Sequence, residues 1–278
     1  MPCADQVSPR SRCSGGRTIC SSPQRSAART SWPRTRSWRR ARNRCRRYPR
    51  CVRGVAFFDI DLTLVNTNGA GRGAMRRAFE ALGFDGELLV TLPIDGRTDR
   101  AIFLDALGQY GVPAGEREAA LAAVVERYLA LLPEELASRG GSVLPGAREL
   151  VGVLAEEGWA LGLATGNLRG GAEAKLTFFE LWEPFAFGGF GDGATLREAV
   201  VGEAVAAAEA FLGKPVPRER AWVIGDTPLD IQAARAAGLR ALGVATGNYG
   251  PTELAAAGAD AVVRSLANLA DVLAALDP

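Results

Sequence analysis

A short apolar run that ends in two carboxylates constrains this chain more than any other stretch. Residues 55–58 are Val, Ala, Phe and Phe, and Asp59-Ile60-Asp61 follows directly. A run of this length and composition predicts a buried strand. Ligands bind at the carboxyl ends of strands in open parallel α/β sheets, so this strand would deliver Asp59 and Asp61 to that edge. Two carboxylates so close repel each other unless a cation lies between them or one is protonated. Ordinary polar turn residues would explain the pair equally well, so the remaining sequence must decide.

The inventory of reactive side chains limits the chemistry that the chain could perform. Its 278 residues include no histidine, and all five cysteines lie within residues 1–53. Mechanisms built on a Ser-His-Asp or Cys-His arrangement are therefore excluded, as are metal sites that need histidine. Carboxylates, hydroxyls, arginines and two lysines, Lys175 and Lys214, remain. This inventory favours a hard cation such as Mg²⁺, which binds carboxylate and carbonyl oxygens.

Residues 1–53 differ from the remainder in composition. They contain fifteen arginines, no lysine and one acid, which gives a net charge of +14, whereas the rest of the chain carries −12. Dense like charge without apolar periodicity predicts a disordered tail. The tail could be a basic arm for nucleic acid, an organelle transit peptide, or translated sequence upstream of the true start. We favour the last, because arginine, cysteine and acid usage all change abruptly before Gly54.

From residue 54 onward, the sequence predicts an α/β core interrupted by helices. Apolar residues recur at helical spacing in three early segments, with no strand pattern between them: 74–82, 98–110 and 115–132. From residue 143, strands and helices alternate, which is typical of a doubly wound, Rossmann-like parallel sheet. We therefore assign residues 54–67 and 143–278 to an α/β core and residues 68–142 to an inserted all-helical cap domain.

Three of the predicted strand ends carry polar residues that would meet at one edge of the sheet. The three groups are Asp59 with Asp61 and Thr63, then Thr165-Gly166-Asn167, and last Gly225-Asp226-Thr227 with Asp230. Together they supply carboxylates, hydroxyls and a cluster of backbone amides. Phosphoryl transfer needs these groups, since a metal neutralises the phosphate while a carboxylate attacks in line.

The order and spacing of these motifs resemble those of the haloacid dehalogenase superfamily, on its phosphatase side, as in phosphoglycolate phosphatase and its relatives. The resemblance covers residues 54–278. It implies that Asp59 is the nucleophile, which forms an aspartyl-phosphate, and that Asp61 is the general acid and then the general base. It also implies two sets of binding residues, a Mg²⁺ site of Asp59, Asp61 through its carbonyl oxygen, Asp226 and Asp230, and a phosphate site that includes Thr165, Gly166 and Asn167.

Two features narrow the reaction that the resemblance implies. The dehalogenases of this superfamily lack an acid at the position of Asp61, so its presence implies transfer from a phosphate ester. The phosphonate-cleaving members form a Schiff base with a lysine of the cap. Residues 68–142 contain no lysine, which argues against phosphonate cleavage.

The phosphate-binding cation has two candidates. Lys175 follows Thr165 on a predicted helix, where some relatives place this lysine, and Arg197 follows the next predicted strand, where others place it. We prefer Lys175, because a lysine makes a point-charge contact that the larger guanidinium fork does not reproduce. The alternative for Lys175 is an exposed helix charge, the usual environment of a lysine.

Residues 95–99 lie in the insertion, where caps of this superfamily meet the site and select the leaving group. Thr98 fits a helix N-cap, and Asp99 fits a favourable acid in the first turn. A further hypothesis is that Arg97 contacts a carboxylate or a second phosphate of the substrate.

We therefore expect a Mg²⁺-dependent phosphatase that hydrolyses a small organic phosphomonoester such as 2-phosphoglycolate. A phosphomutase of the β-phosphoglucomutase type would share every core residue, and a binding protein on a phosphatase fold is the non-enzymatic alternative. The partner would be a small phosphorylated metabolite. No apolar run approaches the roughly 18 residues of a membrane span, and the −12 charge of residues 54–278 disfavours nucleic acid. We expect a soluble, cytoplasmic monomer or homodimer.

Overall fold

A computed structural model describes residues 52–277 of the chain. Most of the basic segment lies outside the described residues, so the expectations for residues 1–51 stay predictions. Among residues 52–277, no helix is both long and apolar enough to cross a membrane.

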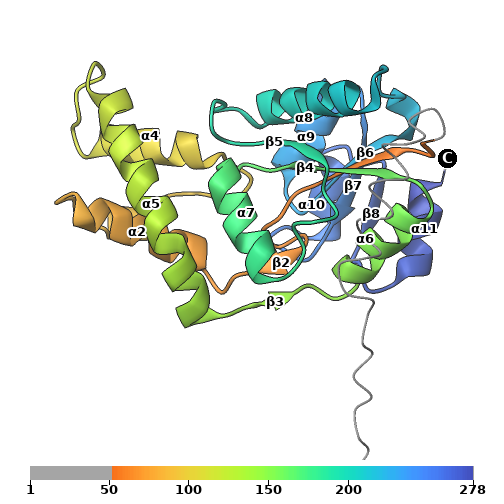
Figure 1. The fold of residues 1–278 in the computed structure, drawn as a ribbon, viewed down its shortest axis with the longest axis horizontal. Coiled ribbons are helices and arrows are strands. Elements are labelled where there is room, and N and C mark those ends of the chain that lie inside the picture. Colours follow the sequence, from red (N-terminus) through yellow and green to blue (C-terminus); the bar gives the residue numbers. More distant parts are fainter. Residues whose placement is uncertain (1–51, 278) are drawn as a thin grey trace, which may run out of the picture. The chain divides into compact units, whose positions relative to one another are not determined.

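Six parallel strands form the central sheet, in the order β5-β4-β1-β6-β7-β8 (Figure 1). This arrangement confirms the predicted doubly wound α/β fold. The strands are β1 (Val55–Phe58), β4 (Ala160–Ala164), β5 (Phe187–Gly189), β6 (Ala221–Gly225), β7 (Arg240–Val244) and β8 (Ala261–Val263).

Strand β1 lies in the middle of this sheet, between β4 and β6. Val55 pairs with Ala160 on one side and with Ala221 on the other. All four residues of β1 are fully buried. The sequence of a parallel strand that is covered on both faces is a continuous apolar run, and residues 55–58 have this pattern.

Helices cover both faces of the sheet, and the alternation of β1 side chains divides them. Val55 and Phe57 face one apolar cluster, to which α8 (Arg197–Leu212), α9 (Pro228–Ala236) and α10 (Pro251–Ala256) contribute. Ala56 and Phe58 face the other cluster, to which α6 (Ala147–Glu156), α7 (Arg169–Phe178) and α11 (Leu269–Leu276) contribute. A short 3₁₀ helix, Arg218–Arg220, precedes β6.

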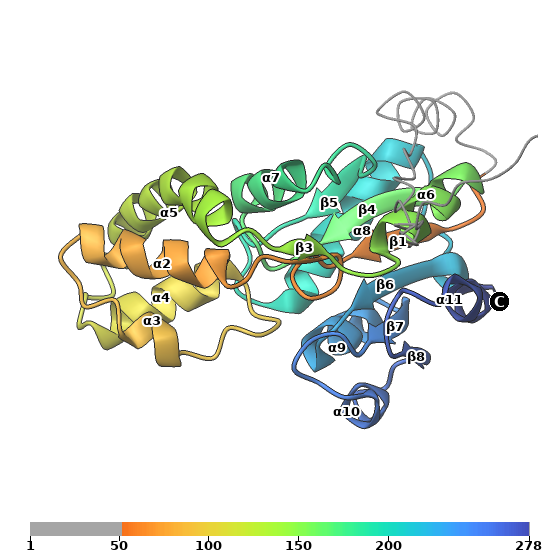
Figure 2. The same cartoon turned by 90° about the horizontal axis from the view of Figure 1, so that it is seen from below.

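The helices that follow β1 in the chain have an apolar core of their own. They are α2 (Ala70–Ala81), α3 (Leu88–Thr91), α4 (Asp99–Gln109) and α5 (Arg117–Arg139). Phe79, Phe103 and Tyr128 are buried at the centre of this cluster, in tilted or edge-to-face ring contacts. Figure 2 shows these helices together beyond the carboxyl ends of the sheet strands.

A pair of two-residue strands joins these helices to the rest of the chain. Strand β2 (Val65–Asn66) runs antiparallel to β3 (Ser142–Val143), with Val65 opposite Val143. Neither strand was predicted from the sequence, because two residues are too few to show alternation.

Candidate active site

The sheet order brings the three predicted polar strand ends together. Asp59 follows β1, Thr165 follows β4 and Asp226 follows β6, and these three strands are neighbours. All three residues are buried. The arrangement matches the rule that sites in such folds lie at the carboxyl ends of the strands.

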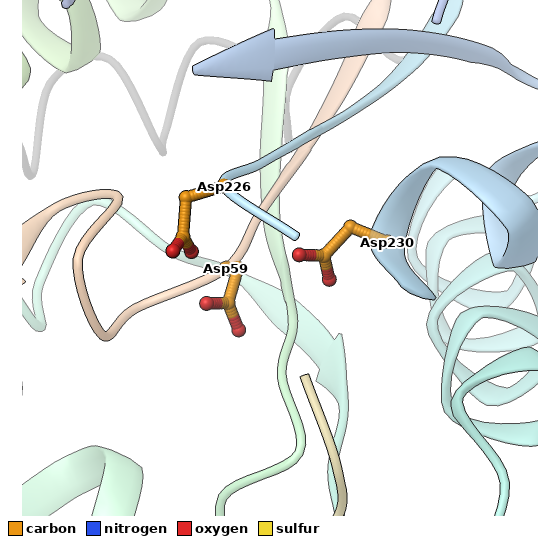
Figure 3. Close-up of side chains that lie close together, drawn as sticks. All are labelled: Asp59, Asp226 and Asp230. Carbon is orange, nitrogen blue, oxygen red and sulfur yellow. The ribbon is translucent and has the colours of Figure 1, made fainter. Parts of the chain in front are cut away.

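Three carboxylates from two of these strand ends form one cluster (Figure 3). One carboxylate oxygen each from Asp59, Asp226 and Asp230 lie within 4.8 Å of one another. Thr63 donates a hydrogen bond of 3.1 Å from Oγ1 to Oδ1 of Asp226, which fixes the orientation of that carboxylate. Three hard oxygen donors at this separation suit Mg²⁺, which binds through carboxylates and keeps several waters.

The start of helix α9 positions Asp230. Thr227 is the N-cap of this helix, and its side chain and that of Asp230 form a capping box. The backbone N–H and the hydroxyl of Thr227 donate to Oδ2 of Asp230 at 3.1 and 2.8 Å. The other oxygen, Oδ1, lies 2.5 Å from a guanidinium nitrogen of Arg197.

Burial and mutual repulsion raise the pKa of two carboxyl groups in the cluster. The pKa of Asp226 rises to about 9, mainly because of burial and then because of the charges of Asp59 and Asp230. Burial also raises the pKa of Asp59 to about 6, although the Arg197 charge opposes the shift. A divalent cation at the cluster would stabilise the ionised forms, so the carboxylates fit a bound Mg²⁺.

Arg197, at the start of α8, lies against the carboxylate cluster. One guanidinium nitrogen is 2.5 Å from Oδ1 of Asp59 and 2.5 Å from Oδ1 of Asp230, and it donates to the Ala164 carbonyl oxygen at 3.1 Å. Its side chain is 3% exposed. Burial alone would lower the pKa of Arg197, but Asp230 and Asp59 raise it, so the guanidinium stays charged.

Lys175 lies at the opposite side of the candidate site, on Asp61. Its Nζ donates to Oδ2 of Asp61 at 2.6 Å and to Oδ1 of Asn167 at 2.5 Å. The lysine is only 4% exposed, so the alternative of a solvated helix charge is wrong. The structure therefore brings both candidate cations into the site, where Arg197 forms an ion pair with Asp59 and Lys175 forms one with Asp61.

The loop after β4 holds a buried network of polar side chains. Thr165 Oγ1 accepts a hydrogen bond of 2.8 Å from Nδ2 of Asn167, and the same nitrogen lies 2.8 Å from Oδ2 of Asp61. Gly166 between them allows a close backbone approach, since a Cβ atom there would lie 2.1 Å from the Arg97 carbonyl oxygen. Only glycine fits this contact.

Asp61 itself stays accessible to a substrate. Its side chain is 39% exposed, in contrast to the buried Asp59. The chain turns directly after it, and Leu62 has a φ of 57°, in the left-handed region that glycine normally occupies. The turn is closed by hydrogen bonds from Leu64 and Val65 to the Ile60 carbonyl oxygen, at 2.9 and 3.0 Å.

Residues 95–99 extend across the mouth of this site. Asn248, in the loop after β7, donates from Nδ2 to Oδ2 of Asp95 at 2.8 Å. A Cβ atom on Gly96 would lie 2.6 Å from Oγ1 of Thr227 in the loop after β6. The segment therefore contacts the loops after β6 and β7, and the close approach of the Arg97 carbonyl oxygen to Gly166 adds the loop after β4.

A pocket of about 200 Å³ lies beneath this segment. Its lining includes Asp59, Asp61, Lys175, Arg197, Asp226 and Arg97. The Arg97 side chain is 25% exposed, and its guanidinium pairs with Asp105 at 2.5 Å and donates to the Pro93 carbonyl oxygen at 3.2 Å. The structure thus places Arg97 at the pocket, but with its charge already shared with Asp105.

Sequence reasoning missed one buried acid near the site. Thr98 is the N-cap of α4, as predicted, and Asp99 is an acid of the first turn, but Asp99 is also 5% exposed and contacts the loop after β4. No local signal could have shown this burial, because the partner of the Asp99 carboxylate is the Leu168 N–H, 69 residues away in the chain.

Comparisons with known proteins agree with this geometry. The sequence profile of the haloacid dehalogenase-like hydrolases matches residues 56–235. A phosphoglycolate phosphatase of Rhodospirillum rubrum is 31% identical over 224 residues, which cover 79% of this chain and 90% of that protein. The chain therefore belongs to the haloacid dehalogenase-like hydrolases. Within the family it is a phosphatase, which hydrolyses phosphoric monoesters.

Solved structures share the fold at lower sequence identity. A predicted phosphatase from Clostridium acetobutylicum is 20% identical with a TM-score of 0.61, and the match covers 81% of this chain and 99% of that one. CbbY from Rhodobacter sphaeroides, solved in complex with phosphate, is 23% identical with a TM-score of 0.58, over 82% of this chain and all of that one. At this identity the likeness supports the fold alone.

Proposed function

We propose that this phosphatase is Mg²⁺-dependent and hydrolyses a small anionic phosphomonoester of the 2-phosphoglycolate kind through an aspartyl-phosphate on Asp59. The observation that carries the proposal is the division of charge in the site. Asp59 lies in a buried carboxylate cluster beside Arg197, while the exposed Asp61 lies beside Lys175. The two aspartates therefore occupy different environments, which suits two different roles.

In the proposed reaction, a carboxylate oxygen of Asp59 attacks the phosphorus atom. The bond from phosphorus to the ester oxygen breaks, and Asp61 gives its proton to the departing alcohol oxygen. Asp61 then takes a proton from a water molecule, which attacks the phosphorus atom and releases phosphate and the Asp59 carboxylate. Asp61 suits this role because its side chain faces the pocket and is accessible.

Mg²⁺ would be held by Asp59, Asp226 and Asp230, with the Asp61 carbonyl oxygen as a further ligand, and it would supply positive charge for the phosphoryl oxygens. Arg197 neutralises part of the cluster and would face the phosphoryl group from the side of Asp59. Lys175 and Asn167 hold the carboxylate of Asp61 from the other side. Thr165 and the amides of the same loop complete the proposed phosphate site.

The proposed substrate class rests on the size and charge of the pocket. A volume of about 200 Å³ leaves room for a small metabolite beside the phosphoryl group. Arg97 lines this pocket and could contact a second anionic group of the substrate if its pair with Asp105 opens. The named activity of the Rhodospirillum rubrum relative also makes 2-phosphoglycolate the first substrate to test.

The assignment of residues 68–142 to a cap forms part of the proposal. The separate apolar core of helices α2 to α5 and the contacts of residues 95–99 support it. The cytoplasmic location and the monomeric or homodimeric state remain predictions from the sequence.

A panel of phosphorylated metabolites, assayed for phosphate release with and without Mg²⁺, tests the proposal. We expect hydrolysis that requires Mg²⁺ and that disappears in Asp59→Asn, whereas Lys214→Ala, outside the pocket, retains it. An inert wild-type enzyme across the panel would contradict the proposal. Transfer of the phosphoryl group to a sugar in preference to water would indicate a mutase instead.

A further inference from the structure

Asp99 is a buried acid from the inserted helices that contacts the loop after β4. Its backbone N–H donates to the Gly166 carbonyl oxygen at 2.8 Å. Its Oδ2 accepts a hydrogen bond of 2.9 Å from the backbone N–H of Leu168. Both partners belong to the segment that the proposed function uses for phosphate binding, yet Asp99 itself does not line the pocket.

Asp99 is one of two carboxylates that accept hydrogen bonds from the backbone at the start of helix α7; the other is Asp192, whose Oδ2 accepts from the Arg169 N–H at 2.8 Å. Leu168 is the N-cap residue of this helix and has no side chain that could accept a hydrogen bond. The Asp99 carboxylate satisfies the backbone N–H of this N-cap residue, one of the unpaired donors at the helix start, and lies near the positive end of the helix dipole. The inserted helices therefore contribute, through Asp99, one of the two carboxylates that hold the start of α7.

The elements that Asp99 holds are the ones that contact Asp61. Asn167 precedes Leu168 in the loop, and Lys175 lies on α7. Their side-chain nitrogens both lie within 2.8 Å of Oδ2 of Asp61. A shift of the loop or of the helix start would move both nitrogens relative to this carboxylate.

The surroundings of Asp99 agree with a close electrostatic relation to the same groups. Burial raises the pKa of Asp99 to about 6, and the nearby positive charge of Lys175 offers the largest opposing effect. The hydrogen bond from Leu168 opposes the shift as well, whereas the charges of Asp61 and Asp192 add to it. A buried carboxyl group of this kind destabilises the fold unless its contacts compensate.

We propose that Asp99 is a positioning residue for catalysis: by capping α7 and fixing the loop after β4, it holds Lys175 and Asn167 on Asp61. The inference rests on the proposed role of Asp61 as the acid that protonates the leaving group. Asp99 acts only when the inserted helices lie against the loop, so it also links their docked position to the orientation of Asp61.

The test compares Asp99→Ala and Asp99→Asn on two substrates of nearly the same shape, phenyl phosphate and p-nitrophenyl phosphate. The phenyl ester has the poorer leaving group and depends more on a correctly oriented acid. In Asp99→Ala we expect kcat for phenyl phosphate to fall about 10- to 100-fold, as for a displacement of about 1 Å. We expect kcat for p-nitrophenyl phosphate to fall clearly less, with KM nearly unchanged for both.

Asp99→Asn is the conservative variant, because its amide oxygen can still accept from the Leu168 N–H. It should restore most of the lost activity towards phenyl phosphate. Glu118→Gln is the matched control, since Glu118 is an exposed first-turn acid of α5 that pairs with Arg100 outside the pocket, and it should leave both activities unchanged.

Amide hydrogen exchange supplies a readout that does not depend on turnover. The Leu168 amide should exchange faster in Asp99→Ala and stay protected in Asp99→Asn. Protection that persists in Asp99→Ala would overturn the proposal, as would equal losses on both substrates. Failure of the proposed function looks different, because the wild type would then hydrolyse neither ester, while the exchange result would still report on the contact.

Discussion

Arg197 and Asp59 form a buried ion pair in which one guanidinium nitrogen lies 2.5 Å from Oδ1 of the carboxylate. The same nitrogen lies 2.5 Å from Oδ1 of Asp230, so one cation serves two members of the carboxylate cluster. A buried ion pair is costly to break on one side, because the remaining charge is left without a partner. Arg197 therefore contributes to the order of the site as well as to its charge.

Arg197→Ala should lower kcat for a phosphate ester about 100-fold or more, because the phosphoryl group loses a fixed positive charge on the side of Asp59.

Lys175→Ala should also lower kcat, and the decrease should be larger for phenyl phosphate than for p-nitrophenyl phosphate, since Lys175 contacts Asp61. Steady-state kinetics on both esters provide the measurement. Unchanged turnover in Lys175→Ala, with complete loss in Arg197→Ala, would show that the preference for Lys175 from the sequence is wrong.

Mg²⁺ binding should release protons near neutral pH. Without a cation, a carboxyl group with a pKa of about 9 is mostly protonated at pH 7, and this is the state of Asp226. A metal ligand must be ionised, so binding displaces this proton and Mg²⁺ affinity should increase as the pH rises from 7 towards 9. Titration calorimetry in two buffers of different ionisation enthalpy measures the protons released. Asp226→Asn serves as the control and should release fewer protons on Mg²⁺ binding. Equal proton release in the variant and the wild type would contradict the assignment of Asp226 as a Mg²⁺ ligand.

Mg²⁺ should also stabilise the folded protein. A ligand that binds only the folded state raises the free energy of unfolding, by about 2.7 kcal/mol at a concentration 100 times its Kd. We expect a higher Tm with Mg²⁺ in the wild type and a much smaller increase in Asp226→Asn. The matched control is Asp271→Asn, a surface acid of α11 outside the pocket, which should respond like the wild type.

Arg97→Ala should raise KM for 2-phosphoglycolate far more than for p-nitrophenyl phosphate, because only the former carries a carboxylate. Arg100→Ala is the control, since Arg100 pairs with Glu118 and does not line the pocket. Equal effects of Arg97→Ala on both substrates would assign Arg97 a structural role through its pair with Asp105.

Asp99→Asn should stabilise the protein at pH 8. In the folded protein the pKa of Asp99 is about 6, above the ordinary value of 3.8 that applies to the unfolded chain. The unfolded chain therefore loses this proton at lower pH, and the free energy of unfolding falls as the pH rises from about 4 to about 6. The amide cannot ionise, so the variant avoids a loss of about 2–3 kcal/mol at pH 8. At pH 4 the free energies of unfolding of the variant and the wild type should be nearly equal. Denaturant unfolding at both pH values measures this difference. A variant less stable than the wild type at pH 8 would show that burial does not raise the pKa of Asp99.

Local patterns in the sequence were sufficient for the sheet and for most of the carboxylates. Asp59 and Asp226 each follow an apolar run that is fully buried, and such a strand end is recognisable without knowledge of its neighbours. The capping box of Thr227 and Asp230 is likewise a local signal. The class of fold and the identity of these residues could therefore be predicted.

Contacts between distant segments could not be predicted in the same way. Arg197 begins a helix after an irregular loop, and nothing nearby in the sequence indicates that it turns inward onto Asp59. Lys175 shares a face of α7 with the buried Ala172, three residues earlier, but a lysine on such a face usually extends to solvent. Its burial depends on Asp61, more than a hundred residues away in the chain.

The antiparallel pair β2–β3 has a consequence for how this architecture can vary. Val65 lies opposite Val143 and Asn66 opposite Ser142, so the chain leaves the core and returns to it at adjacent points. Two paired antiparallel strands can be closed by a turn of only a few residues. The helices between β2 and β3 could therefore be shortened, enlarged or replaced without changing the distance between the point where the chain leaves the core and the point where it returns.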